Sequence, residues 1–130
     1  MKILNIDWLE VYCHEPAGQE LTADYFETQG NKVTRRLYGT PIYAEMFTIL
    51  RNDKPWIEIR RNPYSKVSQG GIMHDRSCHI RLSNETCYEE NPIDILRMFI
   101  MANNYTYMSI SRIDICLDFN TFDNGWTAER

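Results

Sequence analysis

The sequence predicts an α+β domain in which a mainly antiparallel sheet of about five strands carries two helices on one face. Two kinds of pattern lead to this prediction. Several short segments alternate between apolar and polar residues with a period of two, which is typical of half-buried strands. Two other segments have the boundaries and apolar spacing of helices. The expected order is β-α-β-β-β-α-β, in a single domain spanning residues 1–130.

The first strand and the first helix are expected within the N-terminal thirty residues. Residues 6–14 (IDWLEVYCH) read as a strand, and residues 21–30 (LTADYFETQG) read as a short helix. Thr22 can cap this helix because its hydroxyl can accept a hydrogen bond from a free amide of the first turn. Gly30 can end it, since glycine readily adopts the backbone conformation found after a helix.

Three further strands are expected in the middle of the chain. Residues 43–51 (YAEMFTILR) and 56–61 (WIEIRR) flank residues 52–55 (NDKP). This polar turn between two apolar segments predicts a hairpin. Residues 78–84 (CHIRLSN) alternate again and predict another strand.

The second helix is expected to begin at Asn91-Pro92, with the asparagine as cap and the proline at the first helical position. It should end at residues 103–104 (NN). Its apolar stripe consists of Ile93, Leu96, Phe99 and Ile100.

The final strand, residues 109–120, has the clearest pattern in the chain. One face carries Ile113, Ile115, Leu117 and Phe119. The other face carries Arg112, Asp114, Cys116 and Asp118. Aspartate is depleted in strands, so two aspartates within one strand require an explanation.

Composition restricts the classes of function. The chain is 43% hydrophobic and 25% charged, as in an ordinary globular domain. Its net charge of −4 lacks the basic excess typical of a free-standing nucleic-acid binder, so any such contact must be local. No apolar run is long enough to span a membrane, and the start does not resemble a signal peptide. The four cysteines form no CxxC pair, which favours reduced thiols in a cytoplasm.

Period two predicts that one face of the sheet is charged. If the helices cover the apolar side, the other side collects Glu58, Arg60, His79, Arg81, Arg112, Asp114 and Asp118, together with Glu10 if the first strand follows the same pattern. This set contains no lysine. Two interpretations remain open. The face is either a solvated surface with weak cross-strand ion pairs, or a site for metal-assisted phosphodiester chemistry.

Strand geometry limits the metal hypothesis. Asp114 and Asp118 lie four residues apart, which is about 13 Å along a strand. Two aspartate side chains hardly span that distance around one ion. One of them is therefore expected to pair with a ligand from a neighbouring strand, such as Glu58 or His79, and the other with an arginine.

Four segments together resemble the N-terminal part of the replication initiation factor family, the rolling-circle initiators of plasmids, phages and conjugative transposons. They are IDWLEVYC, YGTPIYAEMFTILRNDKPWIEIRRNP, CHIRLSN and SISRIDICLDFN. The most specific element is the Ser-Arg-Ile-Asp-hydrophobic-x-hydrophobic-Asp strand at residues 111–118.

The resemblance implies a sequence-specific DNA nickase, in which a tyrosine attacks a phosphodiester and Mg²⁺ or Mn²⁺ polarises the phosphate. The matching metal positions are Asp114 and Asp118, with Glu58 as the third acid. Members of the family carry the nucleophilic tyrosine well beyond this strand, and no tyrosine here matches it. Whether the chain alone is an enzyme therefore stays open.

The functional prediction follows from these observations. The chain is expected to be the N-terminal part of a rolling-circle initiator, with DNA as partner and no membrane association. Arg60, Arg81 and Arg112 are the expected phosphate contacts, because arginine binds phosphate oxygens bidentately. The alternative is a non-catalytic DNA- or protein-binding module of a mobile element. A homodimer is compatible with either function.

Overall fold

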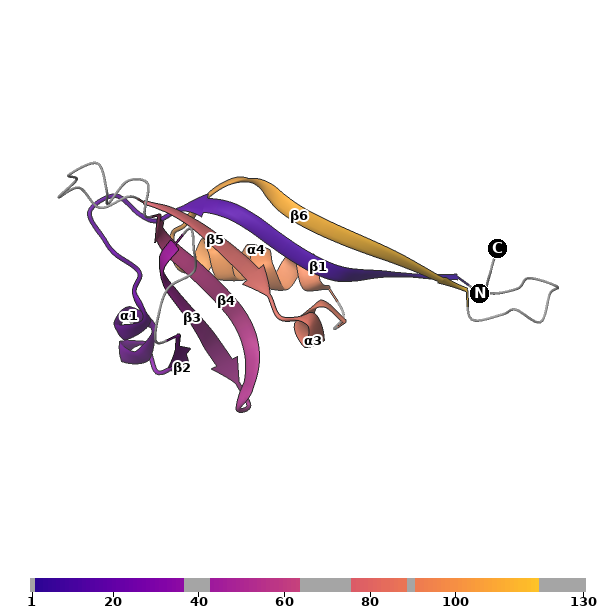
Figure 1. The fold of residues 1–130 in the computed structure, drawn as a ribbon, viewed down its shortest axis with the longest axis horizontal. Coiled ribbons are helices and arrows are strands. Elements are labelled where there is room, and N and C mark those ends of the chain that lie inside the picture. The colour runs from indigo at the N-terminus through magenta and orange to yellow at the C-terminus, as the bar shows by residue number, and fades with distance from the viewer. Residues whose placement is uncertain (1, 37–42, 64–75, 89–90, 120–130) are drawn as a thin grey trace.

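The computed structural model describes residues 2–36, 43–63, 76–88 and 91–119. They form a six-stranded antiparallel sheet in the order β2-β3-β4-β5-β1-β6 (Figure 1). The strands are β1 (Lys2–His14), β2 (Lys32–Arg35), β3 (Tyr43–Arg51), β4 (Lys54–Pro63), β5 (Ser77–Leu82) and β6 (Thr106–Phe119). The helices within this part are α1 (Ala23–Thr28), α3 (Asn84–Cys87) and α4 (Pro92–Ala102).

The predicted fold class and the mainly antiparallel sheet are confirmed, with two additions. The sheet has six strands because the short strand β2 pairs with β3. The helix α3 follows β5, where Ser83 caps it by accepting a hydrogen bond from the amide of Thr86 at 3.1 Å. Both elements are four residues long, too short to produce a periodic pattern in the sequence.

The hairpin of β3 and β4 is tighter than predicted. Its turn consists of Asn52 and Asp53, which have φ angles of 53° and 61°. Two consecutive residues with positive φ are the mark of a type I′ turn, which matches the twist of the flanking strands. Strand β4 consequently begins at Lys54, immediately after the turn, and includes Pro55.

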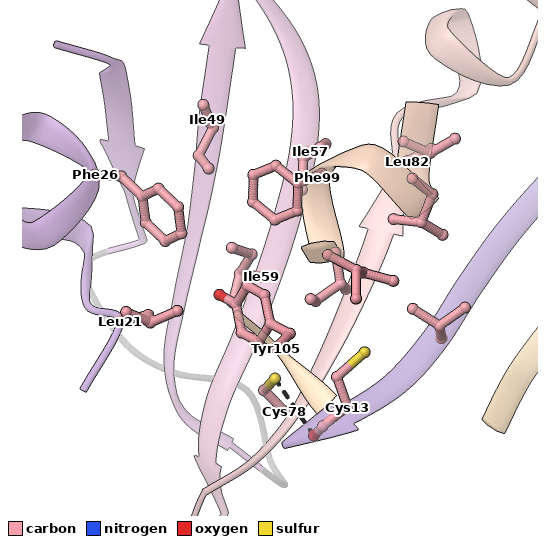
Figure 2. Close-up of a cluster of buried hydrophobic side chains, with 14 of the residues drawn as sticks. Cys13, Leu21, Phe26, Ile49, Ile57, Ile59, Cys78, Leu82, Phe99 and Tyr105 are labelled. Carbon is pink, nitrogen blue, oxygen red and sulfur yellow. Dashed lines mark hydrogen bonds between the residues drawn. The ribbon is translucent and has the colours of Figure 1, made fainter. Parts of the chain in front are cut away.

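Helices α1 and α4 cover the same face of the sheet. Phe26 of α1 and Phe99 of α4 stack with ring centres 5.7 Å apart. Both rings belong to one core cluster with the inward side chains of β4 and β5, among them Ile57, Ile59 and Leu82 (Figure 2). The predicted apolar sides of these strands are therefore confirmed, since those side chains are fully buried.

The boundaries of the helices agree with their predicted signals except at one cap. The hydroxyl of Thr22 accepts a hydrogen bond from the amide of Tyr25, as expected for an N-cap. Pro92 occupies the first turn of α4, but Asn91 makes no side-chain capping bond. Its φ of 61° places it in the left-handed region instead.

The prediction of a half-buried final strand is wrong for the described part of β6. Ile110, Ile113 and Ile115 are 51%, 37% and 58% exposed. The reason is position, because β6 is an edge strand and pairs only with β1 within the described residues. Figure 1 shows β1 and β6 running together as a long two-stranded ribbon that extends away from the helices.

Candidate nucleic-acid interface

The face of the sheet opposite α1 and α4 carries most of the predicted charged residues. We call it the open face and define it by Trp8, Glu10, Tyr12, Glu58, Arg60, His79, Arg81, Arg112 and Asp114. Two cross-strand rows run across it, because directly paired residues of antiparallel strands point to the same side.

The first row is a line of alternating charge. Strand pairing places Glu58 opposite Arg81, Arg81 opposite Glu10, and Glu10 opposite Arg112. The row therefore crosses β4, β5, β1 and β6 in the order acid, base, acid, base. Unlike charges directly opposite each other stabilise an antiparallel pair by a few tenths of a kcal/mol, up to about 1 kcal/mol.

The second row joins Arg60, His79, Tyr12 and Ser109 across the same four strands. The Nε and Nη2 atoms of Arg60 donate to one carboxylate oxygen of Glu58 at 3.1 and 2.9 Å. This contact links the two rows, so the charged groups form one connected surface.

Trp8 lies between two arginines. The guanidinium carbon of Arg81 is 3.4 Å from the centre of the Trp8 ring, and that of Arg112 is 4.1 Å away. The indole nitrogen of Trp8 donates to Glu10 at 3.3 Å. These contacts hold both guanidinium groups against an aromatic ring, which restricts their movement before any ligand binds.

His79 lies between two tyrosines, with ring centres 5.5 Å from Tyr12 and 5.4 Å from Tyr43. The hydroxyl of Tyr43 and Nδ1 of His79 share a hydrogen bond of 2.7 Å. Burial lowers the pKa of His79, and the nearby charge of Arg60 lowers it further, against the opposing charge of Glu10. Burial raises the pKa of Tyr43 to about 12. At neutral pH these two groups are therefore uncharged, and Tyr43 is a poor nucleophile.

Asp114 is engaged by an arginine. The Nε and Nη2 atoms of Arg112 donate to its two carboxylate oxygens at 3.2 and 2.7 Å. These hydrogen bonds lower the pKa of Asp114. The pairing of one aspartate with an arginine agrees with the expectation from strand spacing.

The predicted metal ligands are not brought together in the described part of the chain. Glu58 lies on β4 and Asp114 on β6, with β5 and β1 between them. Three strand spacings separate them by about 14 Å, too far to share an ion. The side chain of Asp118 lies outside the described residues. Within those residues no group of three His, Cys, Asp or Glu side chains could hold a metal ion.

The described thiols are also unsuited to metal binding or nucleophilic attack. Cys13, Cys78 and Cys87 are free and buried. Burial raises the pKa of each, in the case of Cys13 to about 12. They remain protonated at neutral pH and act as small core side chains.

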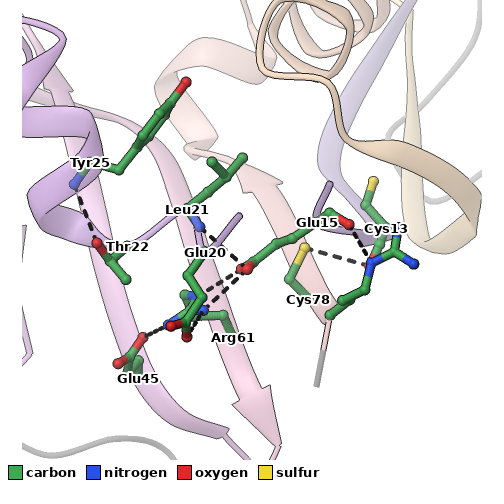
Figure 3. A network of polar contacts seen from close by, with 10 residues as sticks. Cys13, Glu15, Glu20, Leu21, Thr22, Tyr25, Glu45, Arg61 and Cys78 are labelled. Atoms are coloured by element: carbon green, nitrogen blue, oxygen red, sulfur yellow. Dashed lines mark hydrogen bonds and ion pairs between the residues drawn. The ribbon is translucent and has the colours of Figure 1, made fainter. Parts of the chain in front are cut away.

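A second polar cluster, which was not predicted from the sequence, lies on the helix side of the sheet. Arg61 follows Arg60 along β4 and therefore points to the opposite face, where its side chain is fully buried. It donates to Glu15 at 2.7 and 3.1 Å, to Glu20 at 3.0 Å, and to Glu45 (Figure 3). Because these carboxylates surround Arg61, the cluster joins β3, β4 and the segment between β1 and α1 rather than forming a ligand site.

Comparison with protein-family models, with curated proteins and with solved structures finds no match for this chain. The described residues contain no helix of sufficient length and apolarity to cross a membrane.

Proposed function

We propose that this chain is a DNA-contacting domain of the rolling-circle initiator type and that its open face binds the phosphate backbone. The observation that carries the proposal is the oriented arginine set. Arg81 and Arg112 are held against Trp8, and Arg60 is held by Glu58, two residues before it on β4. Guanidinium groups fixed in this way bind phosphate at little entropic cost.

The charge balance of the open face explains how an acidic chain could bind DNA. Each of the three arginines already has a carboxylate nearby, in Glu10, Glu58 or Asp114. Phosphate oxygens would compete for the guanidinium donors with these acids. Arg112 is the most accessible of the three arginines to a phosphate because its side chain is 53% exposed. We expect moderate affinity with a strong dependence on salt.

Fluorescence anisotropy with labelled DNA tests the proposal. Replacing Arg60, Arg81 or Arg112 with glutamine should each weaken binding and reduce the salt slope by about 1. The matched control is Arg97→Gln on α4, an exposed arginine that lies away from the open face. Equal loss in the control, or undiminished binding by all three variants, would contradict the proposal.

The metal requirement of the nickases that this chain resembles remains a separate prediction. Since Glu58 and Asp114 do not converge, we derive no catalytic step from them. Titration calorimetry with Mn²⁺ checks the prediction. Asp114→Ala or Glu58→Ala should weaken binding if that carboxylate ligates the ion together with groups other than the second acid, and unchanged binding by both variants would contradict the assignment of these two ligands. An incubation with origin DNA should give no nicked product, because no tyrosine here matches the family's nucleophile; robust nicking would show that this expectation is wrong.

A protein-binding module is the second candidate, and a different surface favours it. An apolar groove lies between α4 and β6, on the side of the sheet opposite the arginines. The two functions are compatible because they use different surfaces of the chain.

A further inference from the structure

The apolar groove between α4 and β6 has a volume of about 370 Å³. Its floor is formed by Leu9 and Val11 of β1, and one wall by α4. The edge strand β6 supplies the other wall with Tyr107, Ile110 and Ile113. Large apolar side chains on both walls are exposed, which is unusual for a surface that stays in water.

Bulges in β6 explain how so many of its apolar side chains come to the helix side. Strand pairing sets Ile113 opposite Leu9 and Ile110 opposite Val11, with Ser111 as an extra residue between these pairs. The extra residue shifts the alternation, so that Ile110 and Ile113 share a face although they are three positions apart. Leu9 and Val11 are buried, whereas their partners on β6 remain exposed.

The outer edge of β6 has no neighbouring strand among the described residues. Natural edge strands usually avoid exposed apolar residues because a free edge pairs readily with another strand. Here a free edge coincides with an open apolar groove, so one binding partner could both pair with the edge strand and cover the groove.

We propose that a second copy of this chain occupies the groove, with the two β6 strands paired antiparallel about a two-fold axis at Ile113. Such pairing extends the sheet across both copies and keeps the helices on the same side. It places Ile113 opposite its own equivalent and brings the two α4 helices towards each other. Apolar side chains at the groove, including Ile93 and Met101 of α4, would then leave water.

Charge complementarity selects this register. In an antiparallel pair centred on Ile113, Arg112 of one copy lies directly opposite Asp114 of the other, and the contact occurs twice. Both residues point to the open face, where they now pair with each other within one chain. The surface is therefore self-complementary in its charges as well as in its apolar side chains.

Pairing of the two β6 strands alone buries little surface area, so a stable dimer also needs the contact between the α4 helices. A stable interface buries about 800 Å² on each partner. The exposed parts of Ile93, Met101 and Tyr107 add apolar area beside the strand. The dimer does not require DNA, although Arg112 and Asp114 of the open face take part in the contact together with the edge of β6 and the groove.

Sedimentation velocity without DNA tests the proposal, using the whole chain over a wide concentration range. The wild type should form a dimer. Arg112→Asp and Asp114→Arg should each raise the dimer Kd at least about tenfold, because like charges then face each other twice. An equimolar mixture of the two variants should restore dimers, since only the mixed pair has opposite charges at both contacts.

The matched control is Arg35→Asp, which changes an exposed arginine on β2 at the other edge of the sheet and should leave the dimer intact. Circular dichroism verifies that each variant is folded. A wild type that is monomeric at every concentration would overturn the proposal. Dimers of either single variant as tight as those of the wild type would do so too, and so would a mixture that fails to recover them.

Discussion

At the scale of single residues, Arg61 stands out in the described part of the chain because it is a charged side chain within the core. Its side chain is completely buried, and the carboxylate of Glu15 beside it is buried as well. Burial alone would lower the pKa of Arg61, but the hydrogen bonds and charge of Glu15, Glu45 and Glu20 outweigh this effect and raise it. Loss of either partner of this buried ion pair would leave the other as a buried charge without a counterion, which destabilises the folded chain.

Arg61→Ala should therefore be strongly destabilising. Removing the guanidinium leaves Glu15 as a buried charge without its cation, which costs about 3–5 kcal/mol of unfolding free energy. Urea denaturation followed by circular dichroism measures the loss. Arg35→Ala is the control because Arg35 pairs with Asp24 and Glu27 on the exposed surface, and its removal should change stability little. An equal loss in both variants would contradict the assigned role of Arg61.

His79 predicts a dependence of stability on pH. Because burial lowers its pKa in the folded chain, the unfolded chain takes up the proton first as the pH falls. Its contribution to stability is thus present above pH 6.5, the ordinary pKa of histidine, and is lost as the pH falls through the folded-state value.

Denaturation of the wild type and of His79→Gln at several pH values measures this contribution. The wild type should lose more stability than the variant between neutral pH and pH 5. An NMR titration of His79 should give a pKa below 6.5. Identical pH profiles for the two proteins would contradict the burial argument.

At the scale of elements, the helices and strands that have a repeating apolar pattern or a turn signal could be predicted from the sequence. Features that depend on contact with another element could not. Hairpin β3–β4 and helix α4 are marked by turn residues, by Pro92 and by apolar spacing. Strand β2 has no such signal and exists because β3 offers it a pairing edge. Ile113 reads as a core residue, but its burial depends on whether another element covers β6, and alternation cannot reveal that.

The candidate site shows the same division. The assignment of Glu58, Arg60, His79, Arg81 and Arg112 to one face follows from period two and agrees with the strand register. The distance between Glu58 and Asp114 depends on the order of strands in the sheet. That order is a long-range property, so the metal set combined residues that two intervening strands keep apart.

Helix α4 packs onto the core in part through Phe99. Phe99 contacts Phe26, Trp56 and Tyr105 with ring centres 5.7, 5.7 and 6.0 Å away. Phe99→Ala should lower the free energy of unfolding by about 3–5 kcal/mol because it removes these contacts and leaves a cavity. Met98→Ala changes the neighbouring, exposed position and serves as control. Thermal denaturation in which both variants behave alike would contradict this account of the core.

At the scale of the whole molecule, the sheet separates two surfaces of different chemistry. The open face presents oriented arginines among acids, and the helix side ends in an apolar groove at β6. A two-fold pairing through β6 would place two open faces side by side on one continuous sheet. Such an assembly would double the number of arginines available to a DNA backbone, which raises affinity through effective concentration.

An NMR titration with DNA tests the central claim most directly, because it locates the contact without assuming any residue. Amide and arginine side-chain signals should shift at the open face, with the largest changes at Arg60, Arg81 and Arg112 and small changes along α4. Added salt should reverse the shifts, as expected for phosphate contacts. Shifts confined to α4, or a spectrum that DNA leaves unchanged at low salt, would contradict the account.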